Sequence, residues 1–294
     1  MPVNDELGKR MKTYYEQIPQ TKLMRRTPVA IRIDGKAFHT FTRNFDKPFD
    51  EILVDYMYDT MKYLCENIQG CVLGYTQSDE ITLILVDYKK LNSSAWFDYE
   101  VQKVCSIAAS MATMAFNKAF NKHATKFFTD HCYLDWERFD TDKNKQLFDV
   151  YHKAYEAGAM FDARCFNIPR EEVTNLLYWR QVDAARNSIQ MVARAYFSHA
   201  ECQDKNTTAL QEMLFQKYGI NWNDYPVNLK RGSCCIKKKI SEEVFAEEVV
   251  PEWGETYMKE NKTARYGWMI DMEIPMFKGE GREYVEKLIQ PEEE

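Results

Sequence analysis

Two acidic residues, Asp34 and Asp79, stand at points where their carboxylates could act together. Asp34 directly follows the β-branched run 29–33, and Asp79 lies in the polar link 76–80 between two apolar runs. Carboxylate oxygens are hard ligands that suit Mg²⁺ and leave positions open for water and phosphate. A pair of metal ions held in this way stabilises the attacking and the leaving oxygen of a phosphoryl transfer. The two residues therefore indicate a magnesium-dependent phosphoryl-transfer site.

Gly35 and Glu80 extend this candidate site. Gly35 carries no side chain, so the backbone can approach a metal ion or a phosphate closely, and its carbonyl oxygen can act as a further ligand. Glu80 is a weaker third carboxylate. Spacing alone favours a simpler interpretation, in which Asp34 and Gly35 form an ordinary turn and Asp79 and Glu80 lie at a solvated hairpin tip.

Whether the two aspartates meet depends on the elements that carry them. The sequence predicts a strand over 29–33, a helix over 50–68 with Asp50 as its N-cap, and a hairpin from the runs 71–75 and 81–86. A helix over 98–121 and a strand over 165–168 follow. This β-α-β-β-α-β order is that of the ferredoxin-like arrangement, an antiparallel sheet with two helices on one face, which polymerase palms and nucleotide cyclases use. The topology places Asp34 and Asp79 at one edge of the sheet.

The remainder of the chain is divided as follows. Residues 135–158 are polar and irregular, which favours a surface insertion, whereas helices are expected over 170–198 and 207–218. We expect a palm-like catalytic domain over 1–235, with a helical part at about 170–220, and a C-terminal extension of unknown role over 236–294. The expected class is α+β.

Composition and charge narrow the classes of function. The chain is 45% hydrophobic and 29% charged, as soluble globular proteins are, and has a net charge of −6. Residues 241–294 hold 15 acidic and 6 basic residues, and the remaining chain holds 33 basic and 30 acidic residues. Non-specific DNA binding is disfavoured because it needs many phosphate-neutralising cations, whereas a local basic groove for a structured RNA is compatible with the sequence.

The cellular location is expected to be cytoplasmic, without contact to a membrane. No apolar run approaches the roughly 18 residues of a membrane span, and the N-terminal residues lack the features of a signal peptide. None of the eight cysteines forms a C-x-x-C pair, and several lie in apolar runs. We interpret them as reduced core cysteines and expect no zinc site.

Four motifs that occur in a fixed order along the chain resemble those of a known family. They are R-I-D-G-K-A-F-H at 32–39 with Lys47-Pro48, Y-T-Q-S-D-E at 75–80, F-D-A-R at 161–164 and W-R-Q-V-D at 179–183. Together they resemble the tRNA(His) guanylyltransferase family over residues 6–235. The resemblance implies a palm fold, addition of nucleotides to the 5′ end of tRNA in the 3′–5′ direction, and a homotetramer (or dimer of dimers).

The resemblance also implies a set of site residues. Asp34, the Gly35 carbonyl and Asp79 would hold two Mg²⁺ ions, with ATP, GTP and other nucleoside triphosphates as substrates. The nucleotide pocket would be lined by Asp34, Gly35, Lys36, Ala37, Phe38, His39, Lys47, Ser78 and Asp79.

One segment points to a particular branch of the family. After the W-R-Q-V-D motif the chain reads A-R-N-S-I-Q-M at 185–191, where eukaryotic guanylyltransferases carry H-I-N-N-L-Y-N. This is similar to the guanylyltransferase-like branch, which favours template-dependent repair of the 5′ end over addition of an untemplated G to tRNA(His).

Three residues near the first aspartate have alternative interpretations. Lys36 and Lys47 are compact cations that suit triphosphate oxygens, although Lys36 is equally well explained as a surface lysine. His39 can contact a phosphate or donate a proton, or serve as a structural histidine.

Lys103, Arg164 and Arg180 are candidates for holding the RNA 5′ end or its phosphates. The guanidinium groups of Arg164 and Arg180 suit bidentate contacts with phosphate oxygens. The alternative for Arg180 is a pair with Asp183 on a helix surface, since the two residues stand three positions apart. Lys103 lies in an alanine-rich helix and either points into the cleft or extends to solvent.

Two other classes of function compete with tRNA extension. A palm-type nucleotide cyclase or dinucleotide synthase would convert nucleoside triphosphates without RNA, but the chain lacks a G-G-[DE]-[DE]-F-like hairpin. A non-catalytic RNA-binding protein would not need both aspartates.

Overall fold

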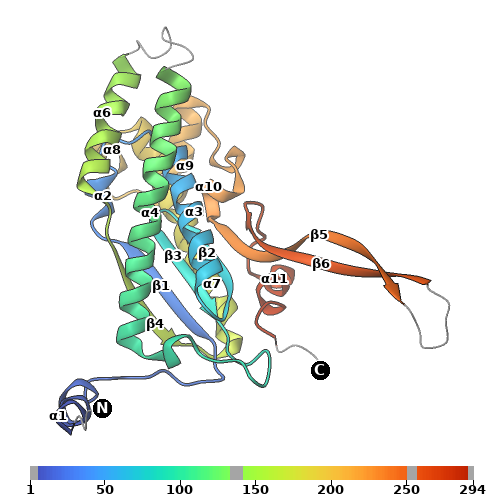
Figure 1. Cartoon of the computed structure of the whole chain (residues 1–294). Helices are drawn as coiled ribbons and strands as arrows, with labels where there is room; N and C mark the ends of the chain where they lie inside the picture. The colour runs from blue at the N-terminus through green and yellow to red at the C-terminus, as the bar shows by residue number, and fades with distance from the viewer. Residues whose placement is uncertain (1–5, 133–141, 250–256, 291–294) are drawn as a thin grey trace.

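The computed structural model describes residues 6–132, 142–249 and 257–290. They form one six-stranded sheet with helices on both of its faces (Figure 1). The strands are β1 Val29–Gly35, β2 Cys71–Gln77, β3 Glu80–Leu85, β4 Phe161–Asn167, β5 Ser233–Val249 and β6 Tyr257–Asp271. The helices are α1 Glu6–Met11, α2 Phe38–Phe41, α3 Glu51–Asn67, α4 Val101–Cys132, α6 Asp142–Ala157, α7 Arg170–Tyr196, α8 His199–Cys202, α9 Thr207–Tyr218, α10 Val227–Arg231 and α11 Glu283–Glu286.

The sheet confirms the predicted fold class. Its strand order is β4-β1-β3-β2-β5-β6, and every neighbouring pair is antiparallel. The first four strands, together with α3 and α4, have the ferredoxin-like arrangement. Helix α3 begins as predicted, because the Asp50 side chain accepts a hydrogen bond from the Leu53 amide at 2.9 Å.

The alternation of side chains along β1 explains why both faces of the sheet are covered. Val29, Ile31 and Ile33 point to α3 and α4 and belong to the main hydrophobic core. Ala30 points to the opposite face, where a second core cluster includes Val173 of α7. This second face then becomes polar toward the end of β1, at Arg32 and Asp34.

Two regions differ from the sequence prediction. Residues 142–157 form the helix α6 rather than an irregular insertion. Its apolar face, formed by Leu147, Val150, Tyr151 and Ala154, packs into the main core. Leu147, Val150, Tyr151 and Ala154 recur at helical spacing, so the sequence does carry the signal of an amphipathic helix, and the prediction of an irregular insertion here was wrong. The part of the predicted insertion at 135–141 lies outside the described residues.

The C-terminal part extends the same sheet. Strand β5 pairs with β2, with Leu73 opposite Ile236, and β5 and β6 continue as a long hairpin beyond the body (Figure 1). Ile274, Phe277 and Ile289 pack into the second core cluster. The predicted domain boundary at residue 235 thus falls within β5. None of the helices in the described ranges is long and apolar enough to cross a membrane.

Candidate active site

The two aspartates are brought to the same end of the sheet. Asp34 lies near the end of β1 opposite Glu80, the first residue of β3, and Asp79 lies in the two-residue turn that joins β2 to β3. The Gly35 amide donates a hydrogen bond to the backbone carbonyl of Asp79 at 3.2 Å. The backbone therefore fixes the two carboxylate-bearing residues next to each other, as the ferredoxin-like topology predicts.

Both carboxyl groups are harder to ionise than in water. The pKa of Asp79 is raised to about 6, chiefly by burial and in smaller part by the negative charge of Asp34. The Ser78 hydroxyl partly opposes this by donating a hydrogen bond to Asp79 Oδ1 at 3.1 Å. Burial also raises the pKa of Asp34, with further contributions from Glu80 and Asp162. The site thus concentrates negative charge that a cation would stabilise.

A hollow beside Asp79 collects several of the predicted nucleotide-binding residues. We call it the Lys47 pocket; it has a volume of about 240 Å³. Phe38, Lys47 and Ser78 line it together with Asp79, whereas Asp34, Gly35 and Ala37 of the predicted set do not. Binding of a nucleotide by these residues stays a prediction. Arg194 of α7 lines it as well, so two cations from different parts of the chain border this pocket. Its full lining is Phe38, Thr42, Phe45, Asp46, Lys47, Pro48, Asp50, Leu53, Ser78, Asp79, Met191 and Arg194.

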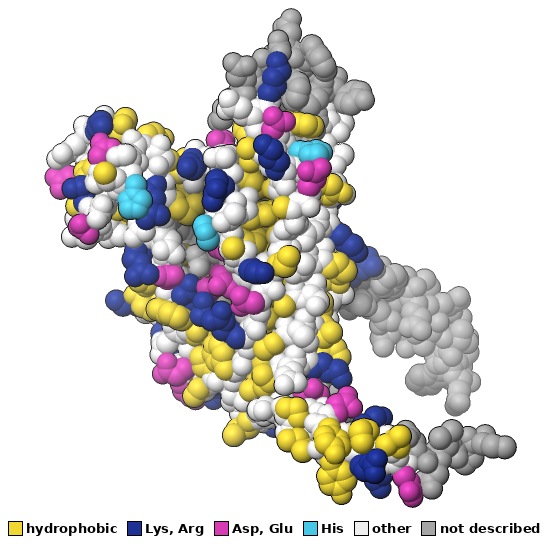
Figure 2. Space-filling model, turned by 90° about the vertical axis from the view of Figure 1, so that its left-hand side faces the viewer, with side chains coloured by type: hydrophobic (Ala, Val, Ile, Leu, Met, Phe, Trp, Pro, Cys, Tyr) yellow, Lys and Arg dark blue, Asp and Glu magenta, His cyan; other side chains and the backbone are white. Residues whose placement is uncertain are grey.

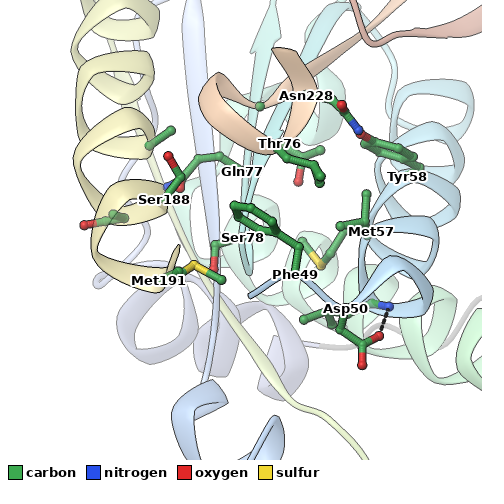
Figure 3. A pocket seen from close by; sticks show the side chains of 16 residues that line it. Phe49, Asp50, Met57, Tyr58, Thr76, Gln77, Ser78, Ser188, Met191 and Asn228 are labelled. Carbon is green, nitrogen blue, oxygen red and sulfur yellow. Dashed lines mark hydrogen bonds between the residues drawn. The ribbon is translucent and has the colours of Figure 1, made fainter. Parts of the chain in front are cut away.

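A second hollow adjoins the first and shares Asp50, Leu53, Ser78 and Met191 with it. We call it the Phe49 pocket; its volume is about 90 Å³. In Figure 3, Phe49 and Met57 lie on one side of it and Ser188 and Met191 of α7 on the other.

Polar groups are also available in the Phe49 pocket. The Asn228 amide donates a hydrogen bond to the Tyr58 hydroxyl at 2.9 Å, and this hydroxyl is 2.8 Å from Ser233 Oγ. Apolar walls with a few fixed polar groups suit a flat heterocycle such as a nucleobase.

Glu80 is bound by two arginines and does not join Asp34 and Asp79 as a third carboxylate. Arg180 Nε donates to Glu80 Oε1 at 2.7 Å and Arg180 Nη2 donates to Oε2 at 2.9 Å, while Arg32 Nη2 donates to Oε2 at 2.7 Å. Arg180 is only 4% exposed and also donates to Asp183 Oδ2 at 2.9 Å. The alternative pairing of Arg180 with Asp183 is therefore present. In the free protein these carboxylates occupy the Arg180 guanidinium, and its contact with an RNA phosphate stays a prediction.

The segment after β1 directs its side chains to different places. Phe38 is buried, and its ring centroid lies 5.1 Å from those of Phe41 and Phe161. Ala37 has a left-handed backbone with φ 54°, which turns the chain into α2. Lys36 and His39 are exposed, and neither lines the Lys47 pocket.

The structure separates the other two predicted RNA contacts. Arg164 of β4 pairs with Arg32 in register, and its charge lowers the pKa of Asp34, so it belongs to the same edge of the sheet. Lys103 lies near the start of α4, 5.6 Å from the Phe97 ring centroid. Two residues later, Cys105 contacts Cys165 of β4, at the level of Ile31 in β1. Lys103 is thus remote from the carboxylate end of the strand.

Arg194 is the main site residue that sequence reasoning missed. It lies on α7, and residues 184, 187, 188, 191 and 194 follow one face of this helix toward the two pockets. This helical spacing beyond the W-R-Q-V-D motif was the available signal. Asn228 could not have been found in this way, since α10 reaches the pocket from a distant part of the chain.

Comparisons with known proteins place the chain in a family. A family model described as tRNAHis guanylyltransferase matches residues 8–169. The chain is 28% identical over 242 residues to the tRNA(His) guanylyltransferase of Schizosaccharomyces pombe. This alignment covers 78% of this chain and 80% of that protein. It is 29% identical over 252 residues to an uncharacterized protein of Acanthamoeba polyphaga mimivirus, over 81% of this chain and 79% of that one.

Solved structures extend the similarity to nearly the whole chain. A bacterial tRNA(His) guanylyltransferase-like protein in complex with ATP is 36% identical with a TM-score of 0.73, over 96% of this chain and 99% of that one. The same type of protein in complex with GTP gives a TM-score of 0.70, with 36% identity over 97% and 99% of the two chains. The Saccharomyces cerevisiae enzyme is 24% identical with a TM-score of 0.55, over 76% of this chain and 91% of that one, which supports the fold alone.

Proposed function

Since this chain belongs to the tRNA(His) guanylyltransferase family, we propose that it is a nucleotidyltransferase that adds nucleotides to the 5′ end of tRNA, growing the strand in the 3′–5′ direction. The observation that carries the proposal is the meeting of Asp34 and Asp79 beside a pocket that also holds Lys47 and Arg194. The similarity to a bacterial protein solved with ATP supports a nucleoside triphosphate as the molecule that enters this pocket.

The residues at the site fit two magnesium ions. Asp34 and Asp79 offer carboxylate oxygens and Gly35 offers a carbonyl oxygen. Within the described ranges no three metal-binding side chains gather. The other ligands would therefore be water and substrate phosphates, as Mg²⁺ prefers. When bound, magnesium would neutralise phosphate charge and lower the pKa of an attacking hydroxyl group.

The charges around the Lys47 pocket also support a need for a divalent cation. Three aspartates, Asp46, Asp50 and Asp79, line it against the two cations Lys47 and Arg194. A triphosphate would meet a formally negative wall there, so its entry should depend on an accompanying divalent cation. Lys47 and Arg194 would then bind the phosphate oxygens, and Ser78 would hold the Asp79 carboxylate in place.

The proposed reaction has two transfers. In the first, an oxygen of the tRNA 5′-monophosphate attacks the α-phosphorus of ATP, or of GTP, and pyrophosphate leaves. In the second, the 3′-hydroxyl of an incoming nucleotide attacks the activated 5′ phosphate, loses its proton, and the nucleoside monophosphate leaves. Later additions use the triphosphate of the nucleotide added last. The protein would contribute mainly by positioning the groups and by electrostatic stabilisation.

We propose template-dependent 5′-end repair as the preferred form of this activity. The support is the segment 185–191, which resembles the guanylyltransferase-like branch. Its residues Asn187, Ser188 and Met191 line the Phe49 pocket, where the differences between the branches would act on the nucleotide.

The resemblance supports two proposals about the setting of the enzyme. We propose that the chain assembles as a homotetramer, or dimer of dimers, and works in the cytoplasm. Ile240 and Tyr266 on the β5–β6 hairpin are 62% and 60% exposed, and apolar side chains of this kind suit a contact between chains. Light scattering of the purified protein tests the assembly.

The decisive experiment is sequencing of RNA 5′ ends after reaction with a panel of 5′-truncated tRNAs, Mg²⁺ and all four nucleoside triphosphates. We expect 5′ extension that follows the opposite strand of the acceptor stem. Asp79→Ala should reduce extension by about 10³-fold, on the order of the contribution of such electrostatic groups. The control Glu66→Ala removes an exposed carboxylate on α3 and should leave extension unchanged.

Two results would contradict the proposal. Undiminished extension by Asp79→Ala would remove the carboxylate pair from the mechanism. A cyclic or dinucleotide product from nucleoside triphosphates and Mg²⁺ without RNA would instead favour a palm-type cyclase or dinucleotide synthase.

A further inference from the structure

A basic groove lies on the side of α2 that faces α6, and the nucleotide site does not account for it. Lys36, Arg43 and Lys153 line this groove, which has a volume of about 450 Å³. Its floor includes Val150, Ala154 and Ala157 of α6, which share one helix face with Lys153. Two stretches of the chain, residues 36–44 and α6 with Gly158, therefore contribute cations to one open hollow.

The charge of the basic groove differs from that of the Lys47 pocket. The residues that line the basic groove include three cations and no aspartate or glutamate, whereas three aspartates line the Lys47 pocket. The basic groove can therefore bind a polyanion without a metal ion, and the Lys47 pocket cannot do so favourably. The two hollows are suited to different parts of a substrate.

The three cations are available for a ligand. Lys36, Arg43 and Lys153 are exposed, and in the part of the chain that the structure describes none of them forms an ion pair. Cations that stabilise a fold are usually paired with carboxylates, as Arg180 is here. Three unpaired cations around one hollow repel each other, and a bound anion would relieve this repulsion.

The basic groove begins next to the carboxylate pair. Lys36 directly follows Gly35, and its amide donates a hydrogen bond to the Met160 carbonyl at 2.8 Å, which ties this loop to the start of β4. A chain of phosphates that ends at Asp34 and Asp79 would therefore reach Lys36 first, and then Arg43 and Lys153. Figure 2 views the molecule from this side and shows lysine and arginine side chains scattered over it, with acidic side chains among them.

We propose that the basic groove is a docking site for the phosphodiester backbone of the RNA substrate, adjacent to the 5′ end that is extended. The proposal rests on the proposed function, because the RNA is placed by its reacting end. Singly charged phosphates at regular spacing match three cations spread over two stretches of the chain, whereas one triphosphate would concentrate its charge at a single point. Backbone contacts of this type position an RNA helix without reading its sequence.

The test measures binding and not extension. The double variant Arg43→Gln/Lys153→Gln is titrated with a fluorescent, 5′-monophosphorylated RNA hairpin at about 50–300 mM salt without nucleotide. We expect about tenfold weaker binding near 100 mM salt, and a slope of log Kd against log salt that is shallower by about two, since each lost phosphate contact removes about one. ATP affinity in the presence of Mg²⁺ should not change, which also shows that the variant is folded.

Matched variants make the result specific. Lys278→Gln/Lys287→Gln removes the same charge from the C-terminal segment and should keep the wild-type slope, and Arg43→Lys/Lys153→Arg should keep it as well. An unchanged slope in Arg43→Gln/Lys153→Gln would overturn the proposal, and so would a loss of ATP affinity with unchanged RNA binding, which would make the groove a nucleotide site. RNA binding is measured without turnover. A failure of 5′ extension would contradict the proposed function but would not change this binding result, so the two claims are tested separately.

Discussion

At the residue scale, the chain uses neighbouring carboxylates in two opposite ways. Asp79 is half-buried, with a pKa raised to about 6, and its neighbours supply too little positive charge to stabilise its ionised form. Glu80, the next residue, is buried but bound by Arg32 and Arg180. The first arrangement leaves a charge available for a ligand, and the second one stabilises the fold.

The raised pKa of Asp79 predicts how stability changes with pH. The folded state binds this proton up to about pH 6, whereas the unfolded state releases it near the ordinary value of 3.8. Without Mg²⁺, this carboxyl group therefore lowers the free energy of unfolding as pH rises from about 4 to 6. Asp79→Asn should be more stable than the wild type at pH 7.5 by about 1–2 kcal/mol, and this difference should vanish toward pH 4.

Urea unfolding at several pH values measures this difference. Glu66→Gln serves as the control, since it neutralises an exposed carboxylate and should show no comparable gain. A destabilised Asp79→Asn protein at pH 7.5 would contradict the account of the site. Addition of Mg²⁺ should stabilise the wild type more than the variant, because only the wild type has the complete carboxylate pair.

The buried cluster around Glu80 predicts a large effect of a single substitution. Arg180→Ala leaves the Glu80 charge buried with only Arg32 as its partner, and we expect a loss of about 3–5 kcal/mol in the free energy of unfolding. Arg186→Ala is the matched control, because Arg186 is exposed and also contacts Asp183, and it should cost less than about 1 kcal/mol. Similar losses for the two variants would show that the Arg180 ion pair is not a main support of the fold.

At the element scale, tight turns hold the pocket in shape. Gly232, between α10 and β5, has φ 80°, and a Cβ atom there would lie 2.4 Å from the Thr76 carbonyl oxygen. This close approach packs α10 against β2 and brings Asn228 to the Phe49 pocket. Gly219, at the end of α9, also has a positive φ of 67°, but a Cβ atom there would meet no other atom within 4 Å among the described residues.

The two glycines give a paired prediction. Gly219→Ala should lose about 1 kcal/mol of stability from backbone strain alone, whereas Gly232→Ala should lose clearly more and should also weaken ATP binding, because the wall of the pocket must shift. Thermal unfolding and ATP titration of both variants measure this. Equal losses in both variants, with wild-type ATP affinity, would show that the approach of Gly232 to Thr76 does not shape the site.

The elements that position the aspartates were predictable, and several others were not. Strand β1, the β2–β3 hairpin and α3 have clear periods and a recognisable cap at Asp50, so the meeting of Asp34 and Asp79 followed from local signals. Helix α6 was missed although Leu147, Tyr151 and Ala154 recur at helical spacing, because the polar composition of the segment was given more weight than its period. Strands β5 and β6 were missed because their pairing is long-range and their sequences mix charged and apolar residues without a clear alternation.

At the scale of the whole molecule, the sheet separates a packed face from a face that becomes polar at one end. The site forms where α7 and the 38–50 segment leave that end open, so it depends on parts of the chain that are far apart in sequence. Sequence motifs identified Lys47, Ser78 and Asp79 around the Lys47 pocket. They could not show that Lys36 faces away from this pocket into the basic groove, since a side chain's direction after a strand depends on the packing of α2 and α6.

The central claim is that Asp34 and Asp79 jointly hold the divalent ions that accompany a nucleoside triphosphate. Calorimetric titration of ATP, with and without Mg²⁺, into the wild type, Asp34→Asn, Asp79→Asn and Glu66→Gln tests this most directly. We predict that Mg²⁺ strengthens ATP binding at least tenfold in the wild type and Glu66→Gln, and that either aspartate substitution removes most of this gain. Equal strengthening by Mg²⁺ in all four proteins would contradict the claim.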